Sequence, residues 1–262
     1  MVTAFDGVTA GLELVQASLD FARRSGLKHH EMWARTGRMW YLYELGHWDE
    51  LLQEADEVTR WDREHGGGTQ IEINALIFSA PARAQRGSVD EAARDAAIFL
   101  PRAREVGDPQ TLLPALVQAA FVTALGGELE EAVALAVEFE RTAHGRRIDV
   151  YGLPTILRVC VAAGELPLAQ SLVDGAADAA DTPVTRHSAT TGRAILAEAR
   201  GRSDEAAALY AEAAAGWSEW GSVVERAYAL LGLGRCGDED AAREASAIFE
   251  RLRAVPFTAL AA

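Results

Sequence analysis

Positive charge is in short supply in this chain of 262 residues. Lys and Arg together number 25 against 39 Asp and Glu, which gives a formal net charge of −14. Proteins that bind nucleic-acid phosphates need clustered Lys and Arg, and the nearest candidate here is the lone pair Arg146–Arg147 beside Gly145. Such a pair is typical of a solvated loop. We therefore expect no direct contact with nucleic acid.

Cysteine, proline and long apolar runs are also scarce. Cys160 and Cys236 are far apart and predict buried thiols in a reducing cytoplasm, not a disulfide or a metal site. No stretch approaches the roughly 20 apolar residues of a membrane span, and the first residues lack the features of a signal peptide. With only 8 prolines and few β-branched runs, the abundant Ala, Leu and Glu favour helix throughout. These features predict a cytoplasmic protein with no membrane partner.

Motifs for phosphate, metal or nucleophilic chemistry are missing as well. The segment Gly66–Thr69 lacks the Lys and the spacing of a phosphate-binding loop, and it predicts a turn between helices. His29 and His30 are adjacent, so on a helix they project about 100° apart and cannot easily share a metal. No Ser/His/Asp or Cys/His arrangement can be located. We predict no metal, no cofactor and no catalytic residue.

What the sequence does contain is a repeated phrase of Gly, a polar or acidic pair and Ala. A Gly just past a helix end adopts the left-handed conformation at little cost. The acid that follows meets the positive end of the next helix dipole, and a small Ala lets two antiparallel helices approach closely. The phrase recurs every 36 to 41 residues, at Gly46, Gly87, Gly127, Gly164, Gly201 and Gly237. This period predicts helix-turn-helix units stacked into a solenoid.

The predicted fold is a single all-α domain over residues 1–262, a right-handed superhelical solenoid of about six units. An unpaired helix over 8–25 precedes them and looks like the second helix of an earlier unit. Solenoid ends normally need polar caps. We therefore expect either that the chain is cut from a longer protein or that its ends, including Val255–Phe257, pair with another copy. The units are expected at 27–65, 70–106, 111–144, 151–181, 186–217 and 222–253.

The repeated phrase resembles the tetratricopeptide repeat (TPR) family over nearly the whole chain. Residues 42–50, and 229–235 followed by 247–252, are more closely similar to the C-terminal repeat regions of actinobacterial LuxR-type ATP-binding regulators and of ATPase-linked class III nucleotide cyclases. The resemblance implies a sensing or scaffolding role in bacterial signalling or transcriptional regulation. It does not carry over ATPase, cyclase or DNA-binding activity, because the modules responsible have no counterpart in this sequence.

In TPR proteins the first helix of each unit lines the concave groove, and this resemblance fixes the candidate binding residues. With the Gly taken as the fifteenth position, the second, fifth, ninth and twelfth positions face the groove. The aromatic content is highest in the first unit, where four of the 6 tryptophans fall between residues 33 and 61. The groove positions hold Trp33, Thr36, Trp40 and Tyr43 in the first unit, Asn74 and Ile77 in the second, Val117 and Phe121 in the third, and Tyr151 and Arg158 in the fourth.

Two interpretations of Trp33, Trp40 and Tyr43 remain open. The rings share one helix face, and they either pack against the N-terminal helix as core or line a binding pocket. In the second case Arg158 is suited to hold a carboxylate or phosphate of a ligand.

The function that we expect is a non-catalytic module that binds a protein segment or a small effector in the groove. One alternative is an enzyme that uses groove carboxylates such as Glu44 or Glu198. The other is a scaffold that self-assembles through its ends, as a homo-oligomer.

Overall fold

The computed structural model describes residues 2–144, 152–177 and 182–257, and within these ranges it contains helices and no strand. The predicted all-α repeat fold is confirmed. The first element, α1 (Val2–Arg24), is kinked at Gly7, where the backbone leaves the helical conformation (φ +89°). The first helices of the units are α2 (Lys28–Glu44), α4 (Gln70–Gln85), α6 (Pro109–Leu125), α8 (Leu153–Ala162), α10 (Pro183–Ala199) and α12 (Val223–Arg235). The second helices are α3 (Trp48–Glu64), α5 (Val89–Val106), α7 (Leu129–Ala143), α9 (Leu166–Ala177), α11 (Ser203–Trp220) and α13 (Glu239–Leu252).

The turns within the units follow the mechanism that the sequence predicts. All six repeat glycines adopt positive φ, from +72° at Gly201 to +110° at Gly237. Alanines of the repeated phrase, such as Ala92 and Ala132, are fully buried between paired helices. The left-handed glycine therefore ends one helix, and the small side chain sets the close spacing to the next.

Helix limits differ from the prediction where a stronger cap lies nearby. The fifth unit, expected over 186–217, begins earlier because Thr182 and Thr185 form a reciprocal capping box with Pro183 in the first turn. Its second helix runs on to Trp220, since the left-handed C-cap is Gly221 (φ +97°). Gly216, which is next to the predicted end at residue 217, lies inside that helix and does not end it.

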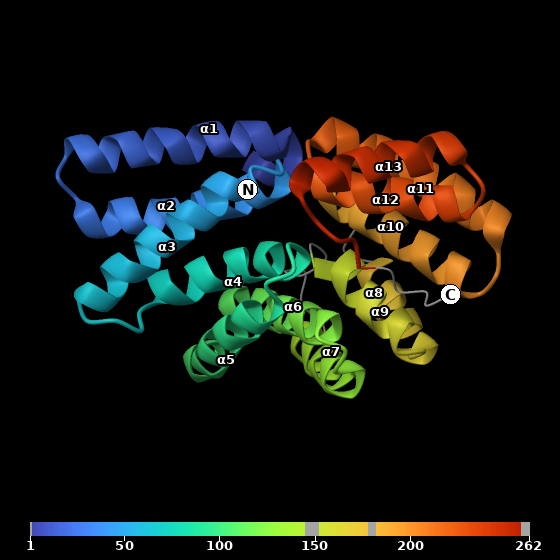
Figure 1. Cartoon of the computed structure of the whole chain (residues 1–262), viewed down its shortest axis with the longest axis horizontal. Helices are drawn as coiled ribbons and strands as arrows, with labels where there is room; N and C mark the ends of the chain where they lie inside the picture. Colours follow the sequence, from blue (N-terminus) through green and yellow to red (C-terminus); the bar gives the residue numbers. More distant parts are fainter. Residues whose placement is uncertain (1, 145–151, 178–181, 258–262) are drawn as a thin grey trace.

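The first helices form a closed ring. Each packs against the next in the order α2, α4, α6, α8, α10, α12, and α12 packs back onto α2. In Figure 1 the blue N-terminal helices accordingly lie beside the orange and red C-terminal helices. The second helices surround this ring, and α1 packs on α2, α10 and α11. The inner side of the solenoid is thus enclosed by helices from both ends of the chain.

The line along which the two ends meet, here called the seam, is closely packed. A Cβ on Gly46 would lie 2.7 Å from Leu252 Cδ2, and one on Gly7 would lie 2.7 Å from the backbone oxygen of Trp220. Arg86 Nε donates to the backbone oxygen of Leu252 at 3.0 Å. The ends therefore cover part of each other within one chain. Pairing with another copy is untested by this arrangement and stays a prediction.

Candidate binding site on the inner surface

A set of polar side chains gathers on the inner surface beside the seam, where α2, α4, α8 and α12 converge. Residues of α2 and α4 meet residues of α12 that lie more than a hundred positions further along the chain. We call this set the inner cluster. It consists of Tyr43, Glu44, Gln85, Arg158, Ser222, Glu225 and Tyr228.

The strongest interaction of the inner cluster joins Arg158 to Glu225. The two guanidinium nitrogens donate to the two carboxylate oxygens, with one distance of 3.0 Å, and the guanidinium lies 4.1 Å from the centre of the Tyr228 ring. The side chains are only 7% and 12% exposed. Burial disfavours the charge on Arg158, but the Glu225 carboxylate outweighs it and raises the pKa of Arg158 above its ordinary value. The arginine therefore stays charged, with its charge compensated inside the protein.

Gln85 connects three helices through one amide group. It is fully buried at the end of α4. Its Nε2 donates to Tyr43 Oη at 3.1 Å, and its Oε1 accepts from Tyr228 Oη at 2.6 Å. Burial raises the pKa of Tyr228 to about 12 and that of Tyr43 well above 10, so both hydroxyls keep their protons at neutral pH. The network is therefore built from neutral hydrogen bonds at its centre.

Glu44 is a carboxyl group held in its neutral form. Burial raises its pKa to about 8, against the opposing effect of the hydrogen bond that Ser222 Oγ donates to Glu44 Oε2. The same Ser222 oxygen accepts from the backbone N–H of Glu225 at 3.1 Å and so caps α12. The neighbouring Glu225 carboxylate raises the pKa of Glu44 further, and Arg158 lowers it. At pH 7 Glu44 is mostly protonated.

The segment after α13 lies across the inner cluster. The Val255 N–H donates to the backbone oxygen of Gln85 at 2.8 Å, and the Phe257 N–H donates to Tyr228 Oη at 3.1 Å. The Phe257 ring meets the edge of the Phe121 ring with a centroid distance of 5.6 Å. We call residues 254–257 the tail. A cavity of about 20 Å³ beside its aromatic ring, enough for one water molecule, is lined by Arg158, Val161, Ile195, Glu198, Tyr210, Tyr228, Arg235 and Phe257.

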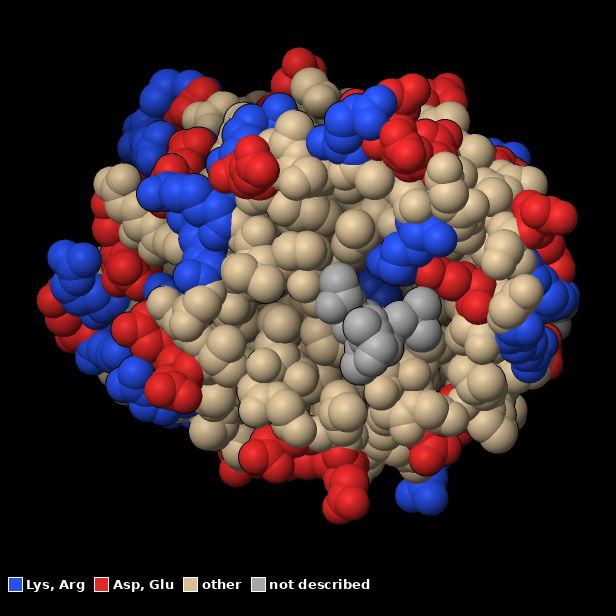
Figure 2. Space-filling model, turned by 45° about the vertical axis from the view of Figure 1, so that its right-hand side comes forward, with Lys and Arg blue, Asp and Glu red and all other residues tan. Residues whose placement is uncertain are grey.

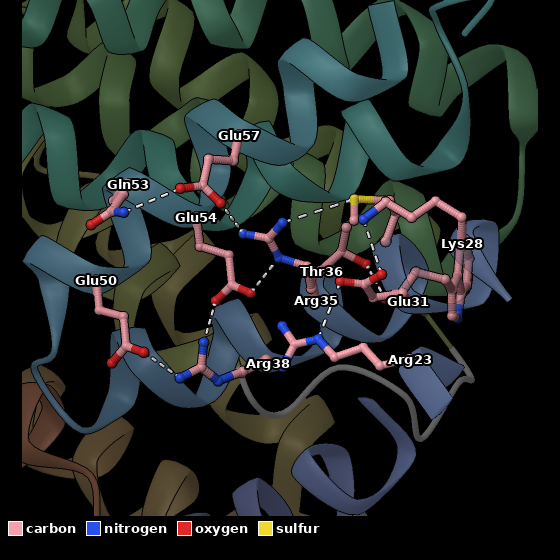
Figure 3. Close-up of polar contacts among 12 residues, drawn as sticks. Arg23, Lys28, Glu31, Arg35, Thr36, Arg38, Glu50, Gln53, Glu54 and Glu57 are labelled. Carbon is pink, nitrogen blue, oxygen red and sulfur yellow. Dashed lines mark hydrogen bonds and ion pairs between the residues drawn. The ribbon is translucent and has the colours of Figure 1, made fainter. Parts of the chain in front are cut away.

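Ion pairs fix α2, which carries Tyr43 and Glu44, against α3. Figure 3 shows Arg35 and Arg38 reaching from α2 to the acids of α3. Arg35 bonds Glu54 at 2.8 Å and Glu57 at 2.6 Å, and Arg38 bonds Glu54 at 2.7 Å. Glu54 is only 4% exposed, and its two arginine partners offset the cost of burying its charge. This network holds the groups of α2 in position on the inner side.

The three aromatic residues predicted to share a surface separate in the structure. Trp33 is 48% exposed. Trp40 is half-buried and packs edge-on against Trp220 at the seam, with 5.9 Å between ring centres. Tyr43 joins the inner cluster and stacks on Trp48 at 5.4 Å. The three side chains of this helix therefore lie in solvent, at the seam and at the inner surface, respectively.

The remaining predicted residues divide in the same way. Thr36 is buried, and its hydroxyl donates to the backbone of Trp33 at 2.8 Å. Asn74 is half-buried and accepts from Gln70, whereas Ile77 and Val117 are buried in the core. Phe121 and Arg158 reach the inner surface, where the tail and the inner cluster contact them. Tyr151 lies outside the described residues.

Glu198, the second carboxylate considered for catalysis, is fully engaged. Arg235 donates to both of its oxygens, one at 2.8 Å, and Tyr210 Oη donates at 2.6 Å. The sequence analysis missed Gln85, Ser222, Glu225 and Tyr228. The only local signal was the Ser-x-x-Glu spacing of Ser222 and Glu225, which by itself indicates a helix start.

Three other expectations bear on the site. Within the described ranges, no group of three or more His, Cys, Asp or Glu is placed to hold a metal ion. No helix in the part of the chain that the structure describes is long and apolar enough to cross a membrane. Cys160 and Cys236 are free thiols, and burial raises the pKa of Cys160 to about 12.

Figure 2 shows that uncharged residues dominate the centre of one face of the molecule, with most charged residues around its rim.

Comparison with known proteins supports the class of fold. No protein-family model matches the chain, and no curated protein sequence matches it. A solved structure of a Rap protein complexed with competence and sporulation factor is similar to it, with a TM-score of 0.61 at 12% identity, over 92% of this chain and 71% of that one. The chain therefore has a TPR-like helical-repeat fold. At this level of identity the likeness defines the fold alone.

Proposed function

We propose that this protein is a non-catalytic interaction module that binds a segment of a partner protein on the inner surface of its helix ring. The observation that carries the proposal is the inner cluster with the tail across it. There an extended stretch of polypeptide already uses hydrogen-bond acceptors from α4 and α12 and an aromatic contact on α6. Main-chain hydrogen bonds combined with side-chain contacts are a common way to bind an extended peptide.

The similar solved structure agrees with this proposal, since it is a complex of a Rap protein with competence and sporulation factor. Of the residues predicted from sequence, we propose Tyr43, Phe121 and Arg158 as central to binding. Trp33, Thr36, Trp40, Asn74, Ile77 and Tyr151 remain predicted binding residues. A ligand carboxylate at Arg158 has to compete with Glu225, so we propose that this arginine mainly positions the Tyr228 ring.

The wider role follows from the resemblance of residues 42–50, and of 229–235 followed by 247–252, to repeat regions of bacterial regulators. We propose that the module works in the cytoplasm, within bacterial signalling or transcriptional regulation. A small effector is the alternative ligand. The cavity beside Phe257, at about 20 Å³, is far smaller than a drug-sized site of about 300 Å³. At the inner cluster this favours a protein segment over a small effector.

An acid–base function at Glu44 is the second candidate, and its raised pKa is the observation in its favour. Against it, Ser222 is committed to capping α12, and Glu198 is committed to Arg235 and Tyr210. Replacing Glu44 with Gln separates the two candidates. The substitution keeps the hydrogen-bond acceptor for Ser222, so peptide binding should persist, whereas any proton transfer by this group should stop.

A screen of a random peptide library displayed on phage tests the proposed function. The selected peptides are resynthesised with a photo-crosslinker, and the crosslinked residues are identified by mass spectrometry. We expect crosslinks to the inner helices α4, α8 and α12. Failure to select any peptide, or crosslinks confined to the outer helices α5 and α7, would contradict the proposal.

A further inference from the structure

We infer that the tail occupies the site on the inner surface to which the partner segment binds. The tail therefore competes with the partner for this site. The inference rests on the proposed function and makes it specific. The partner is then an extended, uncharged segment with two backbone N–H donors two residues apart and an aromatic side chain on the second of them. Binding requires the tail to leave.

The backbone of the tail matches the spacing of the acceptors. Alternate N–H groups, those of Val255 and Phe257, point to the Gln85 backbone oxygen and to Tyr228 Oη. The residue between them is Pro256, which has no N–H to satisfy. The Gln85 oxygen belongs to the last turn of α4, where carbonyl groups lack a partner within the helix. The site thus offers two acceptors that an extended segment of another protein can use equally well.

The side chain of Phe257 packs against the protein, whereas that of Val255 is exposed. Phe257 is half-buried against Phe121 and next to the cavity that Tyr228 lines. Val255 is 68% exposed, so its backbone, not its side chain, makes the contact. Recognition therefore depends on the aromatic ring and the two N–H groups.

The way the tail is attached to α13 allows another polypeptide segment to replace it on the inner surface. Helix α13 ends at Leu252, and its C-cap, Arg253, adopts the left-handed conformation (φ +54°). The Ala254 N–H donates to the backbone oxygen of Phe249 at 2.9 Å. Residues 254–257, which follow this cap, have no regular secondary structure. They can leave the inner surface without unwinding α13. Because its connection to α13 is short, the tail has an effective concentration in the millimolar range at the site. Peptides that bind weakly therefore fail to displace the tail, whereas peptides that bind tightly displace it.

Equilibrium binding of a tail-derived probe to the full chain tests the inference. The probe is a fluorescein-labelled, C-terminally amidated peptide with the sequence of residues 253–257, and the readout is fluorescence anisotropy. The full chain with Phe257→Ala should bind the probe roughly tenfold tighter than the parent, because its own tail competes less well. A probe with Ala in place of its Phe should bind neither chain. Phe21→Ala, which removes a 60% exposed ring on α1, is the matched control and should bind like the parent.

Equal affinity of the parent and the Phe257→Ala chain for the probe overturns the inference, as does equal binding of the two probes. If Phe257→Ala fails to fold by circular dichroism, 4-fluorophenylalanine at position 257 of the full chain gives a second readout. Its 19F resonance should move to a solvent-like position as the unlabelled probe is added, and an unchanged resonance at saturating probe refutes displacement. Library peptides that crosslink to the inner helices without being displaced by the probe leave the proposed function standing and remove only the role of the tail.

Discussion

The neutral carboxyl of Glu44 makes the free energy of unfolding depend on pH. Its pKa is about 8 in the folded chain, against an ordinary value of 4.5. Between these two values the folded state holds a proton that the unfolded chain has released. The free energy of unfolding therefore falls as pH rises through this window. The Glu44→Gln variant, which cannot ionise, should escape that loss.

The magnitude follows from the difference in pKa. Each pH unit within the window costs about 1.4 kcal/mol. The variant should equal the parent near pH 4.5, exceed it by about 3 kcal/mol at pH 7, and level off above pH 8 at about 5 kcal/mol. The figures are upper values, because Glu44 is partly exposed and solvent screening reduces them. The hydrogen bond from Ser222 survives, since the Gln oxygen accepts it in the same place.

Urea denaturation followed by circular dichroism, at constant ionic strength from pH 5 to 8.5, measures the difference. Glu31→Gln is the matched control with the opposite sign. Burial opposes the shift there, but hydrogen bonds from Lys28 and Arg23 hold the pKa of Glu31 below its usual value. That variant should therefore be less stable than the parent at neutral pH, by an amount that shrinks as pH falls. A Glu44→Gln difference that is the same at pH 5 and pH 8 would refute the reasoning.

Two further predictions concern packing and charge, and both are measured as free energies of unfolding in urea. Arg158→Met should destabilise the protein by about 3–5 kcal/mol, because it leaves the buried Glu225 carboxylate unpaired. Adding Glu225→Leu should restore most of the lost stability. A double variant as unstable as the single one would contradict the explanation. Gly232→Ala places a Cβ 2.3 Å from Cζ of the buried Tyr210 ring and should cost about 1–3 kcal/mol. By contrast Gly37→Ala, with no atom within 4 Å, should stabilise helix α2 by about 0.5–1 kcal/mol, and the opposite ranking of the two would show that the close approach at Gly232 is not the controlling feature.

Local features of the fold could be predicted from the sequence because their causes are local. A glycine at a helix end and an acid at the next helix start act within a few residues, and so the repeat period locates the turns. The predicted limits fail where a stronger signal lies nearby, as at Thr182 before the fifth unit and at Gly221 after Gly216. Gly221 ends α11 because it adopts positive φ beyond the last turn, while Gly216 faces the ring of His187 inside the helix.

The closed ring and the inner cluster could not be predicted in this way. The path from Tyr43 through Gln85 to Tyr228 depends on the small rotation from each unit to the next, summed over all the units. No single unit carries a signal for that sum. The groove positions inferred from the TPR resemblance therefore identify inward residues such as Phe121 and Arg158, but not which of them lie beside α12. Gln85 and Tyr228 appear as ordinary residues of alanine-rich helices until the ends meet.

Closure of the ring also decides what a ligand on the inner surface can change. Gln85 belongs to the N-terminal half of the ring and Tyr228 to the C-terminal half, and the two are joined across the seam by one hydrogen bond and by the tail. At the outer edge of the seam, Arg86 donates to the backbone oxygen of Leu252 and pairs with Asp49. The Asp49 side chain is 74% exposed, so salt screens this pair. A partner segment that replaces the tail keeps the same two acceptors in use. The partner segment therefore replaces the hydrogen bonds of the tail across the seam with its own. It shifts the equilibrium between a closed and an open ring only by the difference in free energy between these two sets of contacts.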